Sequence, residues 1–580
     1  MESRIKRLIT RAVLVLQPDF GGDISLSIPQ LQFGDYSSNV ALILAKKLKR
    51  NPFEIAIQIA DSVQSNENIE KCVAIKPGFV NVWIKKNCIF EALNRPLEEK
   101  LGSSDSLAGV KIMVEYTDPN FFKEFHVGHL YSNIVGESLT RIFEVNGAIV
   151  KRANYQGDVG MHVSKYLWGA QEKMKKEELT IQIISTLNTS DRAKFMGQSY
   201  ALGTQTYESN EQAKKEMQEI NRKVYTNDPT IHDLYENSRT WTLEYYETIY
   251  ERLGTHFDYY YFEREAGKVG LEFVKENLKK DIFKESEGAI VFKGEEYGLH
   301  TRVFVNSAGF PTYEAKDLGL APTKYKDFPY DKSLIVVGSE IKEYFTVVMK
   351  ALELINPELR KKTSHVFHGM VNVPEGKMSS RLGNVITANW LLDETQKKAL
   401  QKMQEVTKTN VLKARVDTQK QNSTAEIVGM AAIKYALLKN GIGGNITFNF
   451  DESVSFEGNS GPYLQYTYVR CQSVLERNNL NDMVFNYSED LIMNDEEQAL
   501  MRFMYQFPEN VKRAAVAQNP SIIATYLFNL AQQFNVFYQN NSILKSGGEQ
   551  KQLRLFLTVS TARIIKEGLY LLGIKTVQKM

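Results

Sequence analysis

NFFKEFHVGHLYSN, residues 120–133, places two histidines, His126 and His129, three positions apart with a glycine between them. Side chains at this spacing share one face of a helix, so the pair suits a zinc site, a phosphate-binding site or an ordinary polar helix start. A zinc site needs further ligands, and the neighbouring segments offer no third histidine or cysteine at metal spacing. The choice between the other two interpretations depends on the flanking sequence.

The flanks predict a strand, a turn and a helix. KIMVEY (111–116) alternates Ile112, Val114 and Tyr116 as a strand does. An Asp-Pro-Asn turn follows at 118–120, and a helical pattern runs from about residue 128 to the glycine at 147. The order strand, turn, helix is typical of the beginning of a nucleotide-binding α/β domain. The helix N-terminus would direct backbone N–H groups at an anion, Gly128 would let a base or phosphate approach the main chain, and both imidazoles could donate hydrogen bonds to a phosphate.

A second polar stretch, PEGKMSSRLGN (374–384), combines the cations Lys377 and Arg381 with the small hydroxyl donors Ser379 and Ser380. Flanking glycines make it suited to a mobile loop that closes over phosphates. Taken alone, it would more often be a solvated basic loop.

Hydrophobic periodicity divides the chain into four parts. Residues 1–105 predict an α+β unit, and 106–395 predict an α/β domain with a helical insertion at about 171–285. SLIVVG (333–338) is a continuous apolar run, as a buried parallel strand shows. Residues 396–445 predict a helical linker, and 446–580 predict an all-helical bundle.

The composition is that of an ordinary globular protein of several domains. The chain has 580 residues, a net charge of +2 and three scattered cysteines. Such cysteine usage favours a reducing cytoplasm over a disulfide framework. No apolar run is long enough to span a bilayer, and the basic start, MESRIKRLITRAVLVL, predicts a plain first helix because Glu2 interrupts it and no cleavage pattern follows.

Together, HVGH (126–129) and KMSSR (377–381) resemble the paired HIGH and KMSKS signatures of class I aminoacyl-tRNA synthetases. Longer blocks are similar to those of the arginyl-tRNA synthetases, in the order in which that family carries them. They are FGDYSSNVALILAKKL, DPNFFKEFHVGHLYSNIVGES, RANYQGDVGMH, GAIVFKGEEYGLHTRVFVNSAGFPTYEAKDLG, SFEGNSGPYLQYTYVR and LLGIKTVQKM. The resemblance covers residues from about 30 to 580 and implies a class I Rossmann catalytic domain, an α+β N-terminal domain that touches tRNA, and an all-α anticodon-binding bundle.

The resemblance also implies an arginine site. A guanidinium group needs carboxylates in its plane and often an aromatic wall, and Tyr313 and Asp317, four residues apart, match the positions at which the family holds the arginine side chain. Glu263 matches a second acidic position less closely, and a surface acid is an equal alternative for it. The expected arginine-binding residues are Asp118, Asn120, His129, Glu263, Tyr313 and Asp317, of which Asn120 and His129 face the α-amino and carboxylate groups.

The implied catalytic residues are His126, His129, Lys123, Lys377 and Arg381, which stabilise charge on the phosphates. The implied ATP-binding residues are His126, Gly128, His129, Asn154, Gly157, Asp158, Lys377, Met378, Ser379 and Ser380. The sequence departs from the family pattern in two places. Ser380 stands where a second lysine is usual, and GSEIKEYFTVV (338–348) lacks the His and Gln that relatives often carry.

The implied substrates are L-arginine, ATP with Mg²⁺, and tRNA(Arg), and tRNA is expected to be required for the first step. We expect that the protein has no metal ligands of its own, that it does not bind a membrane, and that it is a monomer. Tyr538 and Phe534 are candidates for stacking on tRNA bases, with core packing as the alternative because both lie on an apolar stripe. Two rival functions are a nucleotidyltransferase for smaller substrates and a tRNA-binding paralogue without catalysis. The C-terminal helices argue against the first, and the intact His126, His129 and Lys377 against the second.

Overall fold

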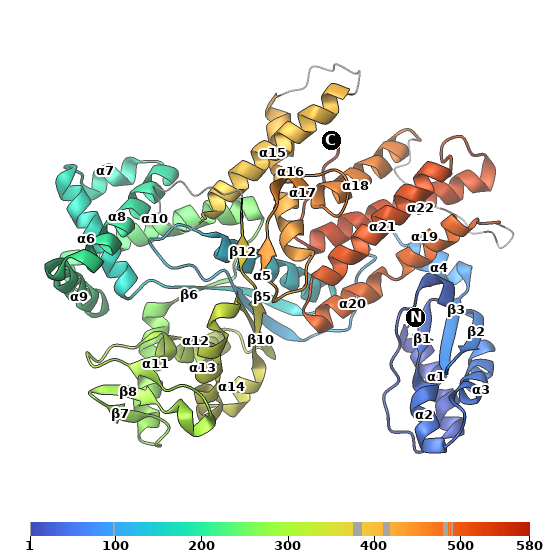
Figure 1. Cartoon of the computed structure of the whole chain (residues 1–580), viewed down its shortest axis with the longest axis horizontal. Helices are drawn as coiled ribbons and strands as arrows, with labels where there is room; N and C mark the ends of the chain where they lie inside the picture. Colours follow the sequence, from blue (N-terminus) through green and yellow to red (C-terminus); the bar gives the residue numbers. More distant parts are fainter. Residues whose placement is uncertain are drawn as a thin grey trace.

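The computed structural model of the chain describes residues 2–96, 99–374, 386–409, 418–478, 485, 488 and 491–580. Figure 1 shows a central sheet with a helical lobe on one side, a helical bundle on the other, and a small N-terminal domain next to that bundle.

The N-terminal domain places helices on a three-stranded antiparallel sheet of order β1-β3-β2. Its α3 begins with Pro52 at the first turn and Asn51 as the cap, which accepts a hydrogen bond from Phe53 N. The elements are α1 (Glu2–Leu16), η1 (Leu31–Phe33), β1 (Tyr36–Ser38), α2 (Val40–Leu48), α3 (Pro52–Gln64), β2 (Ile69–Ile75), β3 (Phe79–Ile84) and α4 (Lys86–Leu93).

The central sheet is parallel, with strand order β11-β10-β4-β5-β6. Its strands are β4 (Lys111–Tyr116), β5 (Ile149–Gln156), β6 (Tyr259–Phe262), β10 (Lys332–Gly338) and β11 (Thr363–His368). Both faces are covered. Ile112 and Val114 belong to the core that includes α5 (Val127–Val145), and Met113 belongs to the core under the helices that follow β6. The predicted strands at 111–116 and 333–338 and the helix after residue 128 are confirmed.

Between β5 and β6 the chain forms the helical lobe, and β6 shows that the predicted insertion of 171–285 is too long. The lobe consists of α6 (Met161–Lys176), α7 (Ile181–Thr186), α8 (Thr189–Ser209), α9 (Glu211–Thr226) and α10 (Pro229–Leu253). Beyond Gly254, which ends α10 in a left-handed conformation at φ 66°, the four residues of β6 pair with β5. The final part of the predicted insertion therefore belongs to the sheet domain.

Further elements follow β6. They are α11 (Glu263–Leu278), β7 (Lys284–Ser286), β8 (Ala289–Phe292), η2 (Gly294–Tyr297), β9 (Arg302–Val305), α12 (Tyr313–Asp327), η3 (Ser339–Ile341), α13 (Lys342–Ile355), α14 (Pro357–Lys362), β12 (Val371–Asn372) and β13 (Ile446–Thr447). Strands β7, β8 and β9 form a small antiparallel sheet, and β12 pairs with β13.

The C-terminal part is helical, as expected. It comprises α15 (Ala388–Thr409), α16 (Thr418–Leu438), α17 (Phe450–Ser453), α18 (Gly461–Glu476), α19 (Asp495–Tyr505), α20 (Phe507–Ala517), α21 (Ser521–Asn540) and α22 (Gly548–Leu571). The predicted boundary between residues 395 and 396 falls inside α15, so that boundary is wrong. Arg502 on α19 joins this part to the N-terminal domain through the carboxylates of Asp35 and Glu70.

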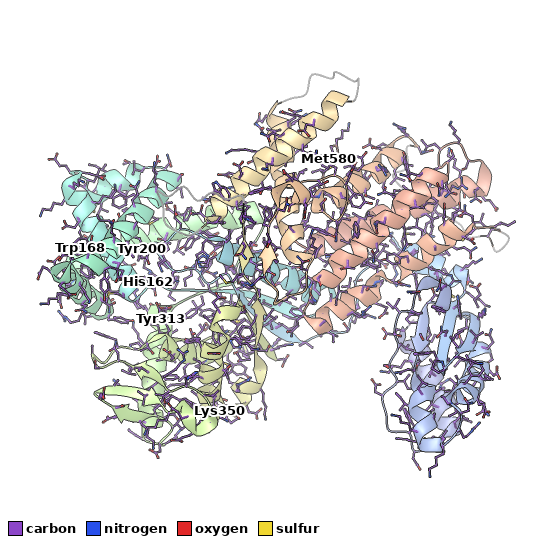
Figure 2. The ribbon with its side chains drawn as sticks, viewed as in Figure 1. His162, Trp168, Tyr200, Tyr313, Lys350 and Met580 are labelled. Carbon is purple, nitrogen blue, oxygen red and sulfur yellow. The ribbon has the colours of Figure 1, made fainter. Side chains whose placement is uncertain are left out.

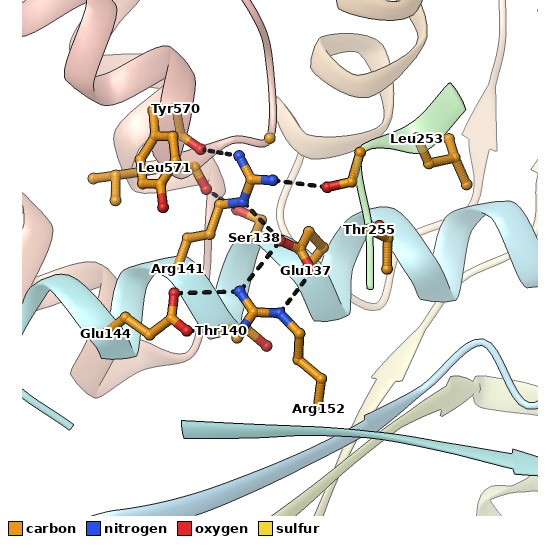
Figure 3. A network of polar contacts seen from close by, with 12 residues as sticks. Glu137, Ser138, Thr140, Arg141, Glu144, Arg152, Leu253, Thr255, Tyr570 and Leu571 are labelled. Carbon is orange, nitrogen blue, oxygen red and sulfur yellow. Dashed lines mark hydrogen bonds and ion pairs between the residues drawn. The ribbon is translucent and has the colours of Figure 1, made fainter. Parts of the chain in front are cut away.

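A buried polar network fixes the far half of α5 to the C-terminal helices (Figure 3). Arg141 donates to Tyr570 O and Gly254 O, both at 3.0 Å, and to Glu137 Oε1 at 2.7 Å. Arg152 on β5 also binds Glu137, with its Nε 3.1 Å from Oε2. The helix that begins with the histidine pair is therefore held rigidly at its other end. In the part of the chain that the structure describes, no helix is long and apolar enough to cross a membrane.

Candidate active site

The described residues predicted to bind arginine and ATP follow the carboxyl ends of β4, β5 and β6 or lie at the start of α12, and parallel sheets bind ligands at this edge. The loop after β4 crosses this edge and extends the sheet, since Phe121 N donates to Gly157 O at 2.9 Å and Gly157 N donates to Pro119 O at 3.2 Å. Thr117 and Asp118 have φ angles of 84° and 42°. Left-handed backbone at residues other than glycine is strained and is typical of functional loops.

His126 and His129 stack on each other at the start of α5, with ring centroids 3.5 Å apart. His126 is the cap residue, and its Nδ1 accepts from Gly128 N at 3.1 Å and His129 N at 3.4 Å. A methyl group on Gly128 would lie 2.9 Å from the His126 ring. The glycine thus makes room for the capping imidazole, a reason that differs from the predicted approach of a ligand.

Burial keeps both imidazoles neutral. It lowers the pKa of His126 to about 4, with the charge of Lys123 adding to the effect, and it lowers the pKa of His129 well below its usual value. His129 Nδ1 is buried and has no hydrogen-bond partner among the described residues. A neutral imidazole can still donate one N–H to an anionic ligand, so the pair suits a site that receives phosphate or carboxylate oxygens.

The residues that follow the second predicted motif in sequence lie beside the first motif. Lys377, Met378, Ser379, Ser380 and Arg381 lie outside the described residues. The residues just after them pair with the main chain before α5: Val127 N donates to Ile386 O at 3.2 Å, and Ala388 N donates to Phe125 O at 2.7 Å. Residues 386–388 are thereby anchored beside the histidines.

Asn120 and Gly157 form one corner of the site together with Glu263, the first residue of α11. A methyl group on Gly157 would lie 2.3 Å from Asn120 Oδ1 and 3.2 Å from Glu263 Oε1. Only glycine therefore leaves room for these two oxygens beside residue 157. Lys123 lies nearby with its Nζ 4.9 Å from the centre of the Tyr200 ring.

Asp317 and Tyr313 lie on α12 across the site. Burial raises the pKa of Asp317 to about 8, although the phenol of Tyr344 donates to its Oδ2 at 2.6 Å. Tyr344 lies in the segment that lacks the family's His and Gln. The Tyr313 ring is half exposed, at 51%. In Figure 2, Tyr313 lies near His162 and Tyr200, which belong to helices of the insertion.

Three predicted ligands have carboxylates or amides already engaged inside the protein. Asn154 is fully buried, and its Nδ2 donates to Tyr116 O at 3.1 Å. Asp158 is also fully buried and accepts from Arg264 N at 2.9 Å, so burial raises its pKa only to about 6. Both side chains are thus buried and hydrogen-bonded within the protein, and their contact with ATP stays a prediction. Asp118 Oδ1 accepts from Tyr155 N at 2.9 Å, and burial raises the pKa of this carboxyl well above its usual range.

Of the two aromatic candidates on α21, only Tyr538 is available at the surface. Phe534 is fully buried and Tyr538 is 37% exposed, with Arg470 lying 5.2 Å from its ring centre. The prediction that Phe534 stacks on a base is wrong, because its ring packs in the helical core. Within the described ranges, no three His, Cys, Asp or Glu side chains are placed to hold a metal ion.

Sequence reasoning passed over Lys316 and Tyr344, which bind the two acids of the site. Lys316 Nζ donates to Glu263 Oε2 at 2.7 Å. In the sequence, only their positions pointed to these two residues. Lys316 directly precedes Asp317, and Tyr344 lies in the segment 338–348, which lacks the His and Gln that relatives often carry.

Comparisons with known proteins agree with this architecture. Three family models match the chain: "Arginyl tRNA synthetase N terminal domain" over residues 2–84, "tRNA synthetases class I (R), catalytic domain" over 95–450, and "DALR anticodon binding domain" over 464–580. The arginine–tRNA ligase of Porphyromonas gingivalis is 30% identical, with 96% of each chain covered, and that of Bacteroides thetaiotaomicron is 30% identical over 99% of each.

The solved arginyl-tRNA synthetase of Thermus thermophilus has the same fold, with a TM-score of 0.81, 22% identity and full coverage of both chains. The fold, the parallel sheet with its histidine pair and the matches over all three parts lead to one conclusion. The chain belongs to the arginyl-tRNA synthetase family of class I aminoacyl-tRNA synthetases.

Proposed function

We propose that the protein is an arginine–tRNA ligase that works in two steps. An oxygen of the arginine carboxylate attacks the α-phosphorus of ATP, and pyrophosphate leaves. A hydroxyl of the terminal adenosine of tRNA(Arg) then attacks the carbonyl carbon of the adenylate, and AMP leaves. The observation that supports this proposal beyond family membership is the stacked, buried histidine pair at the N-terminus of α5, with residues 386–388 paired to residues 125–127 beside it.

The start of α5 would hold the ATP phosphates. His126 and His129 offer imidazole N–H groups at a helix N-terminus, where anions are favoured, and Gly128 would border the phosphates. His126 and His129 would stabilise the charge that grows on the α-phosphate, with Lys123 assisting. Lys377 and Arg381 would add cations from the second motif, and Met378, Ser379 and Ser380 would contact the nucleotide. Gly157 would border the nucleotide, and Mg²⁺ would arrive with the ATP.

Arginine would lie between α12 and the loop after β4. Asp317 would accept the guanidinium N–H groups, and the half-exposed Tyr313 ring would form the wall beside them. Asn120 and His129 would contact the α-amino and carboxylate groups, with Asp118 supporting the loop through Tyr155 N. Tyr538 would stack on a tRNA base. We further propose that the enzyme is a cytoplasmic monomer that needs tRNA for the first step.

Arginine-dependent exchange of labelled pyrophosphate into ATP tests this function. Exchange should require arginine and should be faster when tRNA(Arg) is present. Absence of exchange both with and without tRNA would refute the ligase function. Equal exchange without tRNA would refute only the requirement for tRNA, and exchange driven by another amino acid would refute the specificity.

A further inference from the structure

A pocket of about 410 Å³ lies between α13 and β11, which is an outer strand of the central sheet. Its volume is within the range of small-molecule sites, about 300–1,000 Å³. None of the described residues assigned to arginine or ATP lines it. In Figure 2, Lys350, which lines this pocket, lies well apart from Tyr313 of the candidate active site.

The pocket has an apolar, partly aromatic lining. Phe345 and Met349 lie four residues apart on α13, and they are only 8% and 7% exposed. Phe367 on β11 also lines the pocket, and it packs against the small apolar cluster that contains Phe345. Phenyl rings present flat apolar faces to planar ligands. This part of the pocket therefore suits an aromatic ring.

Three cations, Lys342, Lys350 and Arg360, line the same pocket, and Glu353 is the one carboxylate among the lining residues. Glu353 pairs with Lys350, whose Nζ lies 3.3 Å from its Oε1. Within the described ranges, Lys342 and Arg360 form no ion pair, although Arg360 Nη1 donates to Thr363 O at 3.1 Å. Two positive charges therefore stay available to a ligand, and a guanidinium with an ammonium suits a phosphate group.

The pocket and the candidate active site use different faces of α13. Tyr344 donates to Asp317 Oδ2 at 2.6 Å, whereas the next residue, Phe345, lines the pocket. Successive side chains of a helix are about 100° apart around its axis. The proposed ligase reaction therefore leaves this pocket without a ligand.

We propose that this pocket is a second ligand site, which binds an organic phosphate of about the size of a mononucleotide. The planar ring of the ligand lies against Phe345 and Phe367, and its phosphate group receives Lys342 and Arg360. A phosphate monoester carries a charge of about −1.5 to −2 at neutral pH, which matches the two cations without a carboxylate partner.

Calorimetric titration with 2-naphthyl phosphate tests the site, because this probe joins a flat ring to a phosphate monoester. The wild-type chain should bind it with a dissociation constant of about 1 mM or tighter. 2-Naphthol and inorganic phosphate, which each carry one half of the probe, should bind about tenfold more weakly or less. Absence of binding by the wild-type chain would overturn the proposal.

Substitutions locate the bound probe. Thr346→Trp adds an indole to an exposed lining position on α13 and should abolish binding by filling the pocket. Lys342→Ala and Arg360→Ala should each weaken binding about tenfold, as expected for a lost hydrogen bond to a charged group. Lys361→Ala is the matched control and should bind as wild type does, because Lys361 adjoins Arg360 in sequence but is 71% exposed and does not line the pocket.

Melting temperatures identify any variant that fails to fold, and the folded variants then decide. Unchanged binding in Thr346→Trp would overturn the site, and unchanged binding in both cation variants would overturn the phosphate as its ligand. His129→Ala should keep the affinity for the probe, and loss of binding in this variant would place the probe in the active site instead. Displacement of the probe by tRNA would show that a polynucleotide covers these cations and would overturn the assignment to a small ligand.

Discussion

The two ends of α5 differ in how completely their polar side chains are paired. At its start, His126 and His129 stack over the edge of the sheet, and His129 Nδ1 finds no partner in the described part of the chain. Toward its other end, Glu137 receives both Arg141 and Arg152, and Arg152 also binds Glu144. The histidine end of α5 therefore has a buried ring nitrogen without a partner among the described residues, whereas the carboxylates toward the other end are paired with arginines.

This difference has a physical reason. A buried polar atom without a partner destabilises the fold by about 1–3 kcal/mol, and such atoms persist where a ligand supplies the missing bond. A paired network holds the helix in place so that the histidines need not move when they bind. Substitutions at the paired end should therefore affect stability, and substitutions at the histidine end should affect catalysis.

The largest effect is expected from Glu137→Ala. It leaves the Arg141 and Arg152 guanidinium groups partly unpaired, and removal of one member of a buried ion pair reduces the free energy of unfolding by about 3–5 kcal/mol. Denaturant titration measures this loss. Glu144→Ala is the matched control and should lose less, because the Glu144 side chain is 34% exposed. Equal losses would show that the network has no buried centre at Glu137.

His129→Ala should have the reverse profile. Removal of a preorganised donor to a developing charge should slow pyrophosphate exchange about 10²- to 10³-fold, while the melting temperature stays within a few degrees of wild type. His365→Ala is the control, since His365 is also largely buried with an unpartnered Nε2 within the described residues but lies on β11. A large loss of stability in His129→Ala would contradict the division between the two ends.

Asp317→Asn should raise the arginine KM about 10- to 100-fold, as expected for a lost charged hydrogen bond, and should leave the ATP KM nearly unchanged. Because burial raises the pKa of Asp317 to about 8, the free enzyme holds a proton there at lower pH. Binding of the guanidinium favours the charged carboxylate and releases that proton. Arginine affinity should therefore fall as the pH decreases below 8, and the pH dependence should be flat in the variant. Parallel pH profiles would remove Asp317 from the guanidinium site.

The smallest effect is expected from Tyr538→Ala. Loss of one base-stacking contact should raise the tRNA KM about fivefold or more, corresponding to about 1 kcal/mol, with arginine and ATP constants unchanged. Phe534→Leu is the control, because its ring is buried and it should alter only stability. An unchanged tRNA KM in Tyr538→Ala would leave its exposed ring without a role in tRNA binding.

Most of the fold was accessible from the sequence because the sheet strands have clear periodicity. Ile112, Val114 and Tyr116 alternate, and 333–338 is continuously apolar. The strand β6 was not predicted from the sequence because its four residues, Tyr259–Phe262, lie between long helices. A short strand gains its hydrogen bonds from a distant partner, which local periodicity does not reveal.

The site was predicted less completely than the fold. Motif matching proposed His126, His129, Asn120 and Asp317 as ligand-binding residues, but it did not indicate which candidate side chains are hydrogen-bonded within the chain itself. Asn154 and Asp158 share a block with Gly157, and both are buried and make internal hydrogen bonds. The pairing of Lys316 with Glu263 joins residues 53 positions apart, and only the folded chain brings them together.

The end of α10 and the end of α22 contact their neighbours through main-chain carbonyls, which accept hydrogen bonds from side chains of α5 and α16. Arg141, Ser138 and Lys434 donate to the carbonyl oxygens of Gly254, Leu253, Tyr570, Leu571 and Gly573. Every residue type has a carbonyl, so the carbonyl side of this joint places little restriction on which amino acids occur there. The joint can persist while those segments diverge in sequence, and chimeras that exchange the terminal helices between relatives should dock as long as the three donors are kept.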